Sequence, residues 1–209
     1  VLLARGDQVV LHEARGLASW EYGAANRPDT RFNLGSINKL FTRVAIGQLA
    51  EKGRLSLDDT IAKFLPDYAN REAAKQVTVR QLLDMSSGIG DFFGRKYQET
   101  PKDRIRSLAD YLPLFAAEPL LFEPGSQRRY SNGGYIVLGL IVEKASGQGY
   151  FDYVREHVYS PAGMTATGHL EADVPFGNVA SGYTRNRAGR EPGNEPRRNN
   201  MYTRPARGS

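Results

Sequence analysis

A serine and a lysine three residues apart form the first pair in the chain that could do chemistry, in the stretch Ser36-Ile37-Asn38-Lys39. If this stretch is helical, the two side chains lie one turn apart and point the same way. Serine is a poor nucleophile at its own pKa and needs a neighbouring base, and a lysine can be that base when burial lowers its pKa. The pattern alone is weak, because a serine N-cap followed by a solvated lysine would give the same letters.

The residues that follow predict the helix that would position this pair. Apolar side chains recur at helical spacing, and Gly53 suits a C-cap. Ser36 would then sit at or just inside the helix N-terminus, where the first-turn backbone N–H groups and the positive helix end favour a developing oxyanion. The apolar positions are Ile37, Leu40, Phe41, Val44, Ala45 and Leu49.

A second candidate group is the loop 129–134, with the sequence Arg-Tyr-Ser-Asn-Gly-Gly, between a Pro-Gly turn and an apolar run. A loop pinned by glycines at a helix start can aim side chains into a cleft. Tyr130 could carry a proton between Ser36, Lys39 and a leaving group. Asn132 could hydrogen-bond a substrate carbonyl or hold the lysine. The structural alternative is an asparagine N-cap beside a half-buried tyrosine.

The remaining elements are read from periodicity and turn residues. Strands come first and helices follow from residue 36 to about residue 164, whereas the composition beyond Gly182 shifts to Arg, Asn, Gly and Pro and indicates a loop. The predicted elements are a hairpin of Val1–Ala4 and Gln8–Glu13, edge or connecting strands at Trp20–Gly23 and Arg31–Leu34, a turn and acidic helix start at 55–59, a helix capped by Thr78, a helix at 107–117 broken by Pro113, a buried helix at Gly134–Ala145 ending at Gly147, and a short helix at Phe151–Val158.

Composition narrows the function classes. The 209 residues are 40% hydrophobic, enough for a core, and contain no cysteine, which excludes disulfides and thiolate metal sites. The net charge of +5 resides in residues 184–209, which hold seven arginines and two glutamates, so the rest of the chain is neutral. A neutral body predicts no nucleic-acid partner. No apolar run is long enough for stable membrane insertion, and no basic-then-apolar leader opens the sequence.

Other catalytic patterns are absent from the sequence. The three histidines, His12, His157 and His169, show no metal-ligand spacing, so we expect no metal site. There is no G-x-S-x-G elbow, P-loop or G-x-G-x-x-G. A Ser-His-Asp triad would need one of these histidines to be recruited from a distance.

The two motifs and the sequence around them, in this order, resemble the serine β-lactamase and penicillin-binding-protein superfamily. The resemblance is strongest to its class C β-lactamase-like branch, which includes D-alanyl-D-alanine carboxypeptidases, aminopeptidases acting on D-residues, and esterases. It covers nearly the whole chain. The matching segments are Phe32-x-Leu34-Gly35-Ser36-x-x-Lys39-x-Phe41-Thr42, Leu55-Ser56-Leu57-Asp58-Asp59, Phe64-Leu65-Pro66, Val79-x-x-Leu82-Leu83-x-x-Ser86-Ser87-Gly88 and Pro124-Gly125-Ser126-x-x-x-Tyr130-Ser131-Asn132-x-Gly134-Tyr135.

The resemblance implies an α/β (α+β) fold, an antiparallel sheet flanked by helices with an inserted helical domain. Residues 1–35 would give the first strands, 36–164 the mostly helical domain, and 165–209 a loop-rich basic segment. It also implies that Ser36 is the nucleophile, Lys39 its partner, Tyr130 the second motif's proton-handling residue and Asn132 its substrate-binding companion. No cofactor is expected.

The expected function is that of a serine hydrolase that forms an acyl-enzyme with an ester, a D-amino-acid peptide or a β-lactam. The alternative is a catalytically silent penicillin-binding or peptidoglycan-sensing module. The superfamily's third motif, a Lys or His followed by a small residue and Gly, does not occur before Ser209. We therefore expect a fragment that lacks one oxyanion donor, a loss of ~10²–10³ in rate in other serine hydrolases. A periplasmic or secreted location is the superfamily's expectation, and the oligomeric state stays open.

Overall fold

The computed structural model describes residues 1–170, 174, 176–185 and 195–198. Two compact units make up the chain. The first comprises Val1–Leu34 and Leu170–Pro205, and the second comprises Gly35–His169 and Ala206–Ser209. Parts of the predicted loop beyond Gly182, residues 186–194 and 199–209, lie outside the described residues.

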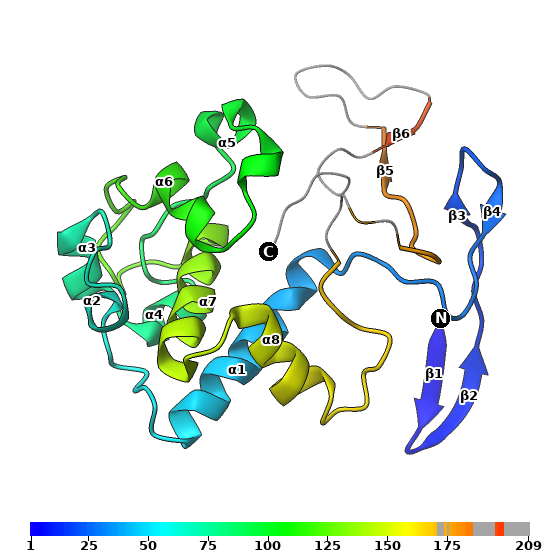
Figure 1. Cartoon of the computed structure of the whole chain (residues 1–209), viewed down its shortest axis with the longest axis horizontal. Helices are drawn as coiled ribbons and strands as arrows, with labels where there is room; N and C mark the ends of the chain where they lie inside the picture. The colour runs from blue at the N-terminus through cyan, green and yellow to red at the C-terminus, as the bar shows by residue number, and fades with distance from the viewer. Residues whose placement is uncertain (171–173, 175, 186–194, 199–209) are drawn as a thin grey trace. The chain divides into compact units, whose positions relative to one another are not determined.

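The first unit contains three two-stranded antiparallel sheets among the described residues (Figure 1). The predicted hairpin is confirmed, with β1 (Leu2–Arg5) pairing with β2 (Gln8–His12) in a register that sets Arg5 opposite Gln8. The others pair β3 (Leu17–Ser19) with β4 (Ala24–Ala25), and β5 (Tyr183–Thr184) with β6 (Arg197–Arg198).

Two predicted strands are wrong. Trp20–Gly23 is the turn between β3 and β4, closed by a hydrogen bond of 3.2 Å from the Gly23 N–H to the Trp20 carbonyl. Arg31–Leu34 supplies only a single bridge, between Arg31 and Val179. Aromatic residues raise strand propensity, but Trp20 and Tyr22 are exposed here, so no packing surface extends the strands through them.

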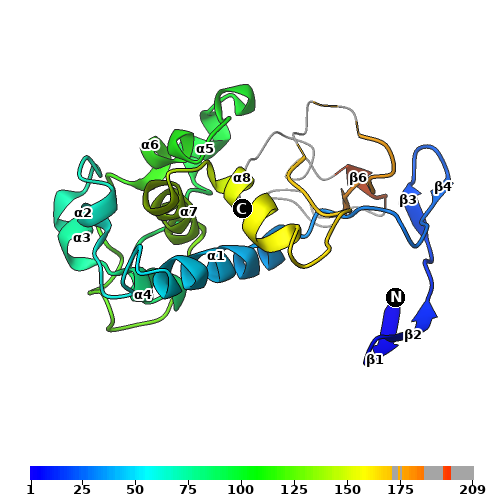
Figure 2. The same ribbon diagram turned by 60° about the horizontal axis from the view of Figure 1, so that its bottom comes forward.

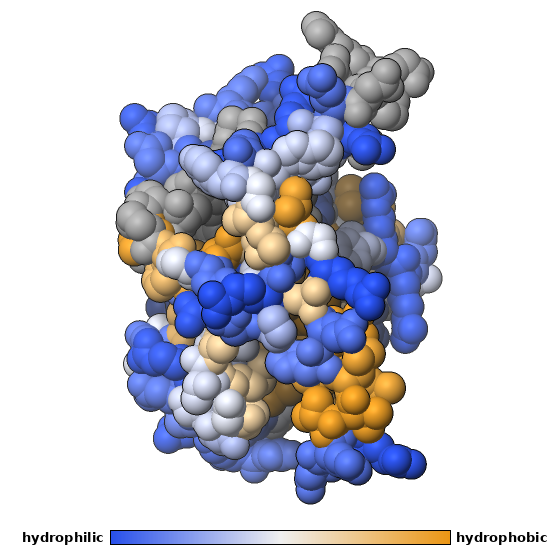
Figure 3. Space-filling view, turned by 90° about the vertical axis from the view of Figure 1, so that its right-hand side faces the viewer, coloured by the Kyte–Doolittle hydropathy of each residue, from blue (hydrophilic) through white to orange (hydrophobic). Residues whose placement is uncertain are grey.

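Apolar side chains of the hairpin lie at the surface. Figure 3 shows hydrophobic colour gathered within a mostly hydrophilic face of the molecule. More than half of the side-chain surface is exposed in Leu2, Leu3, Val9 and Val10, on both strands of the hairpin. Both faces of this two-stranded ribbon therefore carry exposed apolar surface.

The second unit is helical and holds the hydrophobic core (Figure 1; Figure 2). Its α-helices are α1 (Lys39–Glu51), α2 (Ile61–Phe64), α3 (Arg71–Gln76), α4 (Val79–Leu83), α5 (Arg95–Glu99), α6 (Leu112–Phe115), α7 (Asn132–Ser146) and α8 (Tyr150–Val154). Its other helical turns are η1 (Gly35–Asn38), η2 (Lys102–Arg104), η3 (Ala109–Tyr111) and the π-helical η4 (Arg155–Tyr159). Helix α1 packs against α7 and α8, as both ribbon views show.

Helix α7 confirms the predicted buried helix. Every residue from Gly133 to Val142 is buried, as expected for a helix that is apolar on all sides. Ser131 caps its N-terminus by accepting the Gly134 N–H at 2.9 Å. Gly147 ends it in the left-handed conformation, with φ of +77°. The cap and the stop fix where Asn132, the first residue of α7, projects.

Helix α1 also follows the prediction, but its buried face differs from the predicted stripe. It ends before Gly53, whose φ is +66°. Ala45 and Leu49 are buried as expected, whereas Leu40 and Val44 are about half exposed. The residues that α1 buries are Lys39, Thr42, Ala45, Ile46 and Leu49, so two polar residues lie on the packed side of the helix.

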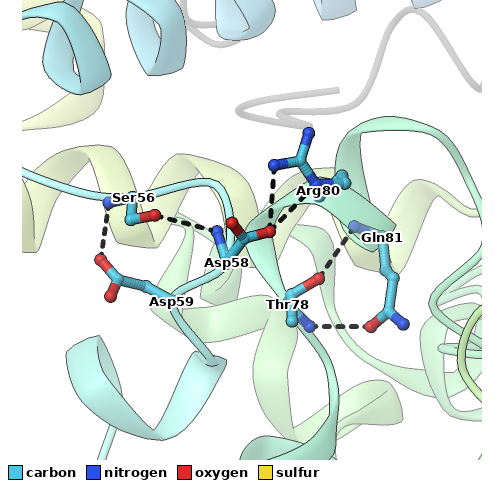
Figure 4. A network of polar contacts seen from close by, with 6 residues as sticks. All are labelled: Ser56, Asp58, Asp59, Thr78, Arg80 and Gln81. Atoms are coloured by element: carbon cyan, nitrogen blue, oxygen red, sulfur yellow. Dashed lines mark hydrogen bonds and ion pairs between the residues drawn. The ribbon is translucent and has the colours of Figure 1, made fainter.

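The predicted turn at 55–59 and the Thr78 cap lie side by side (Figure 4). Thr78 and Gln81 form a reciprocal capping box at the start of α4, which confirms the cap. The acidic helix start is wrong. Asp59 instead closes the turn by accepting the Ser56 N–H at 2.7 Å, and its hydrogen bond from Lys63 lowers its pKa. Asp58 pairs with Arg80 at 3.0 Å, so it links the turn to α4.

Two further predicted helices are not single α-helices. The 107–117 segment divides into η3 and α6, with Pro113 in the first turn of α6, as its missing N–H requires. The Phe151–Val158 segment divides into α8 and a π-helical turn. Within the described part of the chain, no helix has the length and apolar character needed to cross a bilayer.

A buried tyrosine links α8 to α1, and its titration predicts how stability depends on pH. The Tyr150 hydroxyl lies 2.7 Å from Thr42 Oγ1, and burial raises the pKa of Tyr150 to about 12. Because the pKa is higher in the folded state, the contribution of neutral Tyr150 to the free energy of unfolding is fully present below the unfolded-state pKa of about 10. It is lost as the pH rises from about 10 toward 12, by at most ~1.4 kcal/mol per pH unit. Tyr150→Phe should be about 1 kcal/mol less stable than wild type at pH 8.

That deficit should shrink by pH 11, because only the wild type loses the Tyr150 contribution. Free energies of unfolding in urea at pH 8, 9, 10 and 11 measure it. Thr42→Val is the matched control, since it breaks the same hydrogen bond but keeps the titrating phenol, and it should keep the wild-type slope. An equal slope for wild type and Tyr150→Phe would contradict the assignment.

Close packing at the start of α7 gives a second stability prediction. A Cβ on Gly133 would lie 2.5 Å from the Gly90 carbonyl oxygen and 3.0 Å from the Phe115 ring. Gly133→Ala should therefore lower the free energy of unfolding by ~1–3 kcal/mol. In α1, a Cβ on Gly47 would meet nothing within 4 Å. Gly47→Ala should raise stability by about 0.5–1 kcal/mol. Urea unfolding of both variants is the measurement, and shifts of the same sign would refute the packing argument.

Candidate active site

Ser36 lies in the 3-10 turn η1 directly before α1. The turn places its hydroxyl over the first residue of α1, Lys39, whose Nζ lies 3.2 Å from Ser36 Oγ and donates to it. Ser36 is exposed, whereas Lys39 is only 7% exposed. The predicted position of the pair at the helix start is confirmed, with a solvent-facing hydroxyl and a buried amine behind it.

Tyr130, in the loop before α7, contacts the same Ser36 hydroxyl. Its hydroxyl lies 2.5 Å from Ser36 Oγ, within hydrogen-bonding distance, and either oxygen can be the donor. The Tyr130 side chain is itself 54% exposed. Ser36 Oγ is therefore in contact with both groups that could exchange a proton with it, one buried and one facing solvent.

Met85 holds the loop that carries Tyr130. Its carbonyl accepts the Arg129 N–H at 2.9 Å and its sulfur accepts the Ser131 N–H at 3.4 Å, so the loop is fixed on both sides of Tyr130. Met85 adopts φ of +66°, which is rare for a residue with a side chain. This strained conformation at the end of α4 turns both the carbonyl and the sulfur toward the loop.

Asn132 is the second hydrogen-bond partner of the buried Lys39 amine. Its Oδ1 accepts a hydrogen bond from Lys39 Nζ at 2.7 Å. Its Nδ2 donates to Asp91 Oδ2, also at 2.7 Å. The amide is thus held from both ends, and its oxygen gives the lysine the polar partner that a buried amine needs.

Aromatic rings line the path of the lysine side chain. The Lys39 Nζ lies 5.0 Å from the ring centre of Tyr130 and 5.5 Å from that of Tyr135. The Tyr135 hydroxyl accepts from Arg43 Nε at 2.7 Å, which fixes this second ring. Ring faces attract a cation, so they offset part of the cost of burying Lys39 in its protonated form.

All four residues singled out from the sequence therefore meet around Ser36 Oγ and Lys39 Nζ. Sequence reasoning missed Asp91, which follows the Ser86-Ser87-Gly88 segment and lies 41 residues before its partner. It also missed Met85. Neither carries a local signal, because an acid after a glycine turn and a methionine at a helix end are common. Among the residues described, no cluster of three or more His, Cys, Asp or Glu could hold a metal ion.

Comparisons with known proteins give the same family as this geometry. The family model described as beta-lactamase matches residues 1–208. Penicillin-binding protein 4* of Bacillus subtilis strain 168 is 34% identical over 169 residues, which cover 80% of this chain and 37% of that protein.

Two solved structures extend the comparison to the fold. A penicillin-binding protein from Bacillus halodurans has a TM-score of 0.83 and 32% identity, over 98% of this chain and 62% of that one. The D-amino acid amidase from Ochrobactrum anthropi SV3, complexed with L-phenylalanine amide, has a TM-score of 0.73 and 26% identity, over 90% of this chain and 53% of that one.

The chain thus spans less than two thirds of each of these three relatives. Its fold is β-lactamase-like, with helices and short strands as the resemblance implied. The family model matches nearly every residue, and the arrangement of Ser36, Lys39, Tyr130 and Asn132 agrees with that match. The chain therefore belongs to the beta-lactamase family, which includes penicillin-binding proteins.

Proposed function

We propose that this chain carries the acylation machinery of a serine hydrolase, with Ser36 as the nucleophile. One observation carries the proposal, the convergence of Lys39 Nζ at 3.2 Å and the Tyr130 hydroxyl at 2.5 Å on Ser36 Oγ. A hydroxyl within reach of two proton-transfer groups, one of them oriented by a third residue, is the arrangement that activates a serine without histidine.

The reaction begins with attack of Ser36 Oγ on a carbonyl carbon of the substrate. The serine proton passes to Lys39 in its neutral form or to Tyr130 as phenolate, and both routes fit the distances. The new C–O bond forms as the carbonyl π electrons move onto oxygen. When the tetrahedral intermediate collapses, the bond to the leaving group breaks and Tyr130, close to solvent, gives the leaving group a proton. On the tyrosine route this is the proton taken from Ser36, and on the lysine route Lys39 passes that proton on to Tyr130. Water then attacks the acyl-enzyme and releases the acid and Ser36.

Asn132 has room for a second role in this scheme. Its Nδ2 carries two hydrogens, of which one points to Asp91. The other can donate to a carbonyl of the bound substrate, as the sequence motif predicts. The Asn132 side-chain amide would then both bind the substrate carbonyl and orient Lys39.

The substrate class that we propose is an ester or a D-amino-acid amide or peptide. The likeness to a D-amino acid amidase and to penicillin-binding proteins supports this choice over efficient β-lactam hydrolysis. We also propose a periplasmic or secreted location, which the resemblance to penicillin-binding proteins implies. A catalytically silent penicillin-binding module is the alternative, and it predicts an adduct that does not turn over.

Intact mass after incubation with a penicillin, and separately with a p-nitrophenyl ester, tests the proposal. We expect a mass increase that maps to Ser36 and is lost in Ser36→Ala, with acylation at least 100-fold slower in Lys39→Ala. Ser160→Ala, at an exposed serine, is the matched control and should label like wild type. The 209-residue chain is used, and also the longer protein if the gene encodes one.

The outcomes separate the candidate functions. Decay of the adduct with release of product identifies a hydrolase, and a lasting adduct identifies the silent binding module. Labelling that survives in Ser36→Ala would sink the nucleophile assignment, as would a folded longer protein, with the second oxyanion donor present, that neither reagent labels.

A further inference from the structure

Asp91 contacts the proposed active site without being one of its four residues. It lies in the loop between α4 and α5, and both of its carboxylate oxygens are engaged. Oδ2 accepts from Asn132 Nδ2 at 2.7 Å and more weakly from the Asn132 backbone N–H at 3.4 Å. Oδ1 accepts from the Phe93 N–H at 3.0 Å. The carboxylate is therefore held by its own loop and presents one oxygen to Asn132.

The chemistry of the three side chains allows only one orientation of the Asn132 amide. A carboxylate accepts hydrogen bonds only, the lysine amine donates through its N–H groups, and an amide has one end of each kind. With Asp91 on one side and Lys39 on the other, Nδ2 must face Asp91 and Oδ1 must face Lys39. Without Asp91, the amide could turn and set its NH₂ group against the lysine donor.

We propose that Asp91 is a positioning residue for acylation, acting through Asn132 on Lys39. The proposal rests on the function proposed for Ser36. The hydrogen bonds form a series with one direction. The Phe93 N–H holds Asp91, and Asp91 holds the Asn132 amide. Asn132 Oδ1 then holds Lys39 Nζ 3.2 Å from Ser36 Oγ.

A purely structural role for Asp91 would be to cap α7 or to hold its loop against that helix. The structure gives both tasks to other groups. Ser131 Oγ accepts the Gly134 N–H at 2.9 Å and donates to the Gly90 carbonyl at 2.9 Å. The missing side chain of Gly133 lets the same carbonyl approach α7 closely. The short contact of Asp91 is to the Asn132 side chain, and the contact to its backbone is the long one.

A double-mutant cycle of Asp91→Ala and Asn132→Ala tests the proposal kinetically. The maximal acylation rate by the p-nitrophenyl ester and the reagent's apparent dissociation constant are measured separately. In Asp91→Ala we expect the maximal rate to fall about 10-fold or more with the dissociation constant within about 2-fold of wild type. In the Asn132→Ala background, Asp91→Ala should slow the reaction less than about 2-fold, because the group it orients is already gone.

A spectroscopic readout does not depend on activity. In the ¹⁵N-labelled protein, the side-chain NH₂ resonances of Asn132 are identified by their loss in Asn132→Ala. A hydrogen bond to a carboxylate shifts such protons downfield, so Asp91→Ala should move them upfield and speed their exchange with solvent. Asp67→Ala is the matched control, since the Asp67 side chain is 96% exposed, and it should leave both the resonances and the acylation rate unchanged.

Each result decides one claim. Shifted resonances with a coupled loss of rate support the proposal. If Asp91→Ala leaves the Asn132 resonances unmoved, the orienting contact itself is overturned. If the loss of rate in the double mutant equals the product of the two single-mutant losses, the two residues act independently, and action through Asn132 is overturned. A wild type that shows the Asp91-dependent resonances but no acylation refutes the function proposed for Ser36 and leaves the orienting contact in place.

Discussion

The burial of one amine, Lys39 Nζ, constrains the rest of the second unit. Removing an amine from water is costly unless polar partners replace the lost solvation. Lys39 has two such partners, Ser36 Oγ and Asn132 Oδ1, and two aromatic rings beside it. Ser36 lies directly before α1, whereas Tyr130, Asn132 and Tyr135 come from the loop before α7 and from the start of that helix. The fold must therefore bring the start of α1, the start of α7 and the loop before α7 to one place, or leave a buried charge without partners.

The elements that do this carry buried side chains of the hydrophobic core. Helix α7 is buried from Gly133 to Val142 and packs against α1, so packing holds the two helix starts together. Hydrogen bonds from Ser131 to Gly90 and from the 129–131 loop to Met85 tie the loops to this framework. The hydroxyls of Ser36 and Tyr130, which the proposed reaction uses, lie at its exposed rim. A rigid, buried frame with an accessible nucleophile is what pre-organised catalysis requires.

The sequence predicts the elements that carry their own local signals. The capping pair Thr78 and Gln81, the apolar run of α7 and the glycine that ends it give helix boundaries close to those observed. The four site residues could be found because two short motifs recur in a known order. Strands at Trp20–Gly23 could not be excluded from propensity alone, since exposure, not residue type, decides that segment.

The long-range contacts could not be predicted, because they depend on which surfaces meet. Leu40 and Val44 fit the apolar helical stripe as well as Ala45 does, yet α1 buries the face with Lys39 and Thr42. That choice follows from partners on α7 and α8, Asn132 and Tyr150, which satisfy the two polar groups. The pairing of Asp91 with Asn132 is of the same kind.

The location of these contacts also separates two parts of the proposed chemistry. Ser36, Lys39, Tyr130, Asn132 and Asp91 all belong to the second unit, so every contact that would activate the nucleophile is made within it. Activation of a serine lowers the barrier for attack, whereas stabilisation of the oxyanion needs donors aimed at a different atom. The first requirement is built into the helical core. The second needs N–H donors placed at the oxyanion of the substrate, so it is a separate requirement.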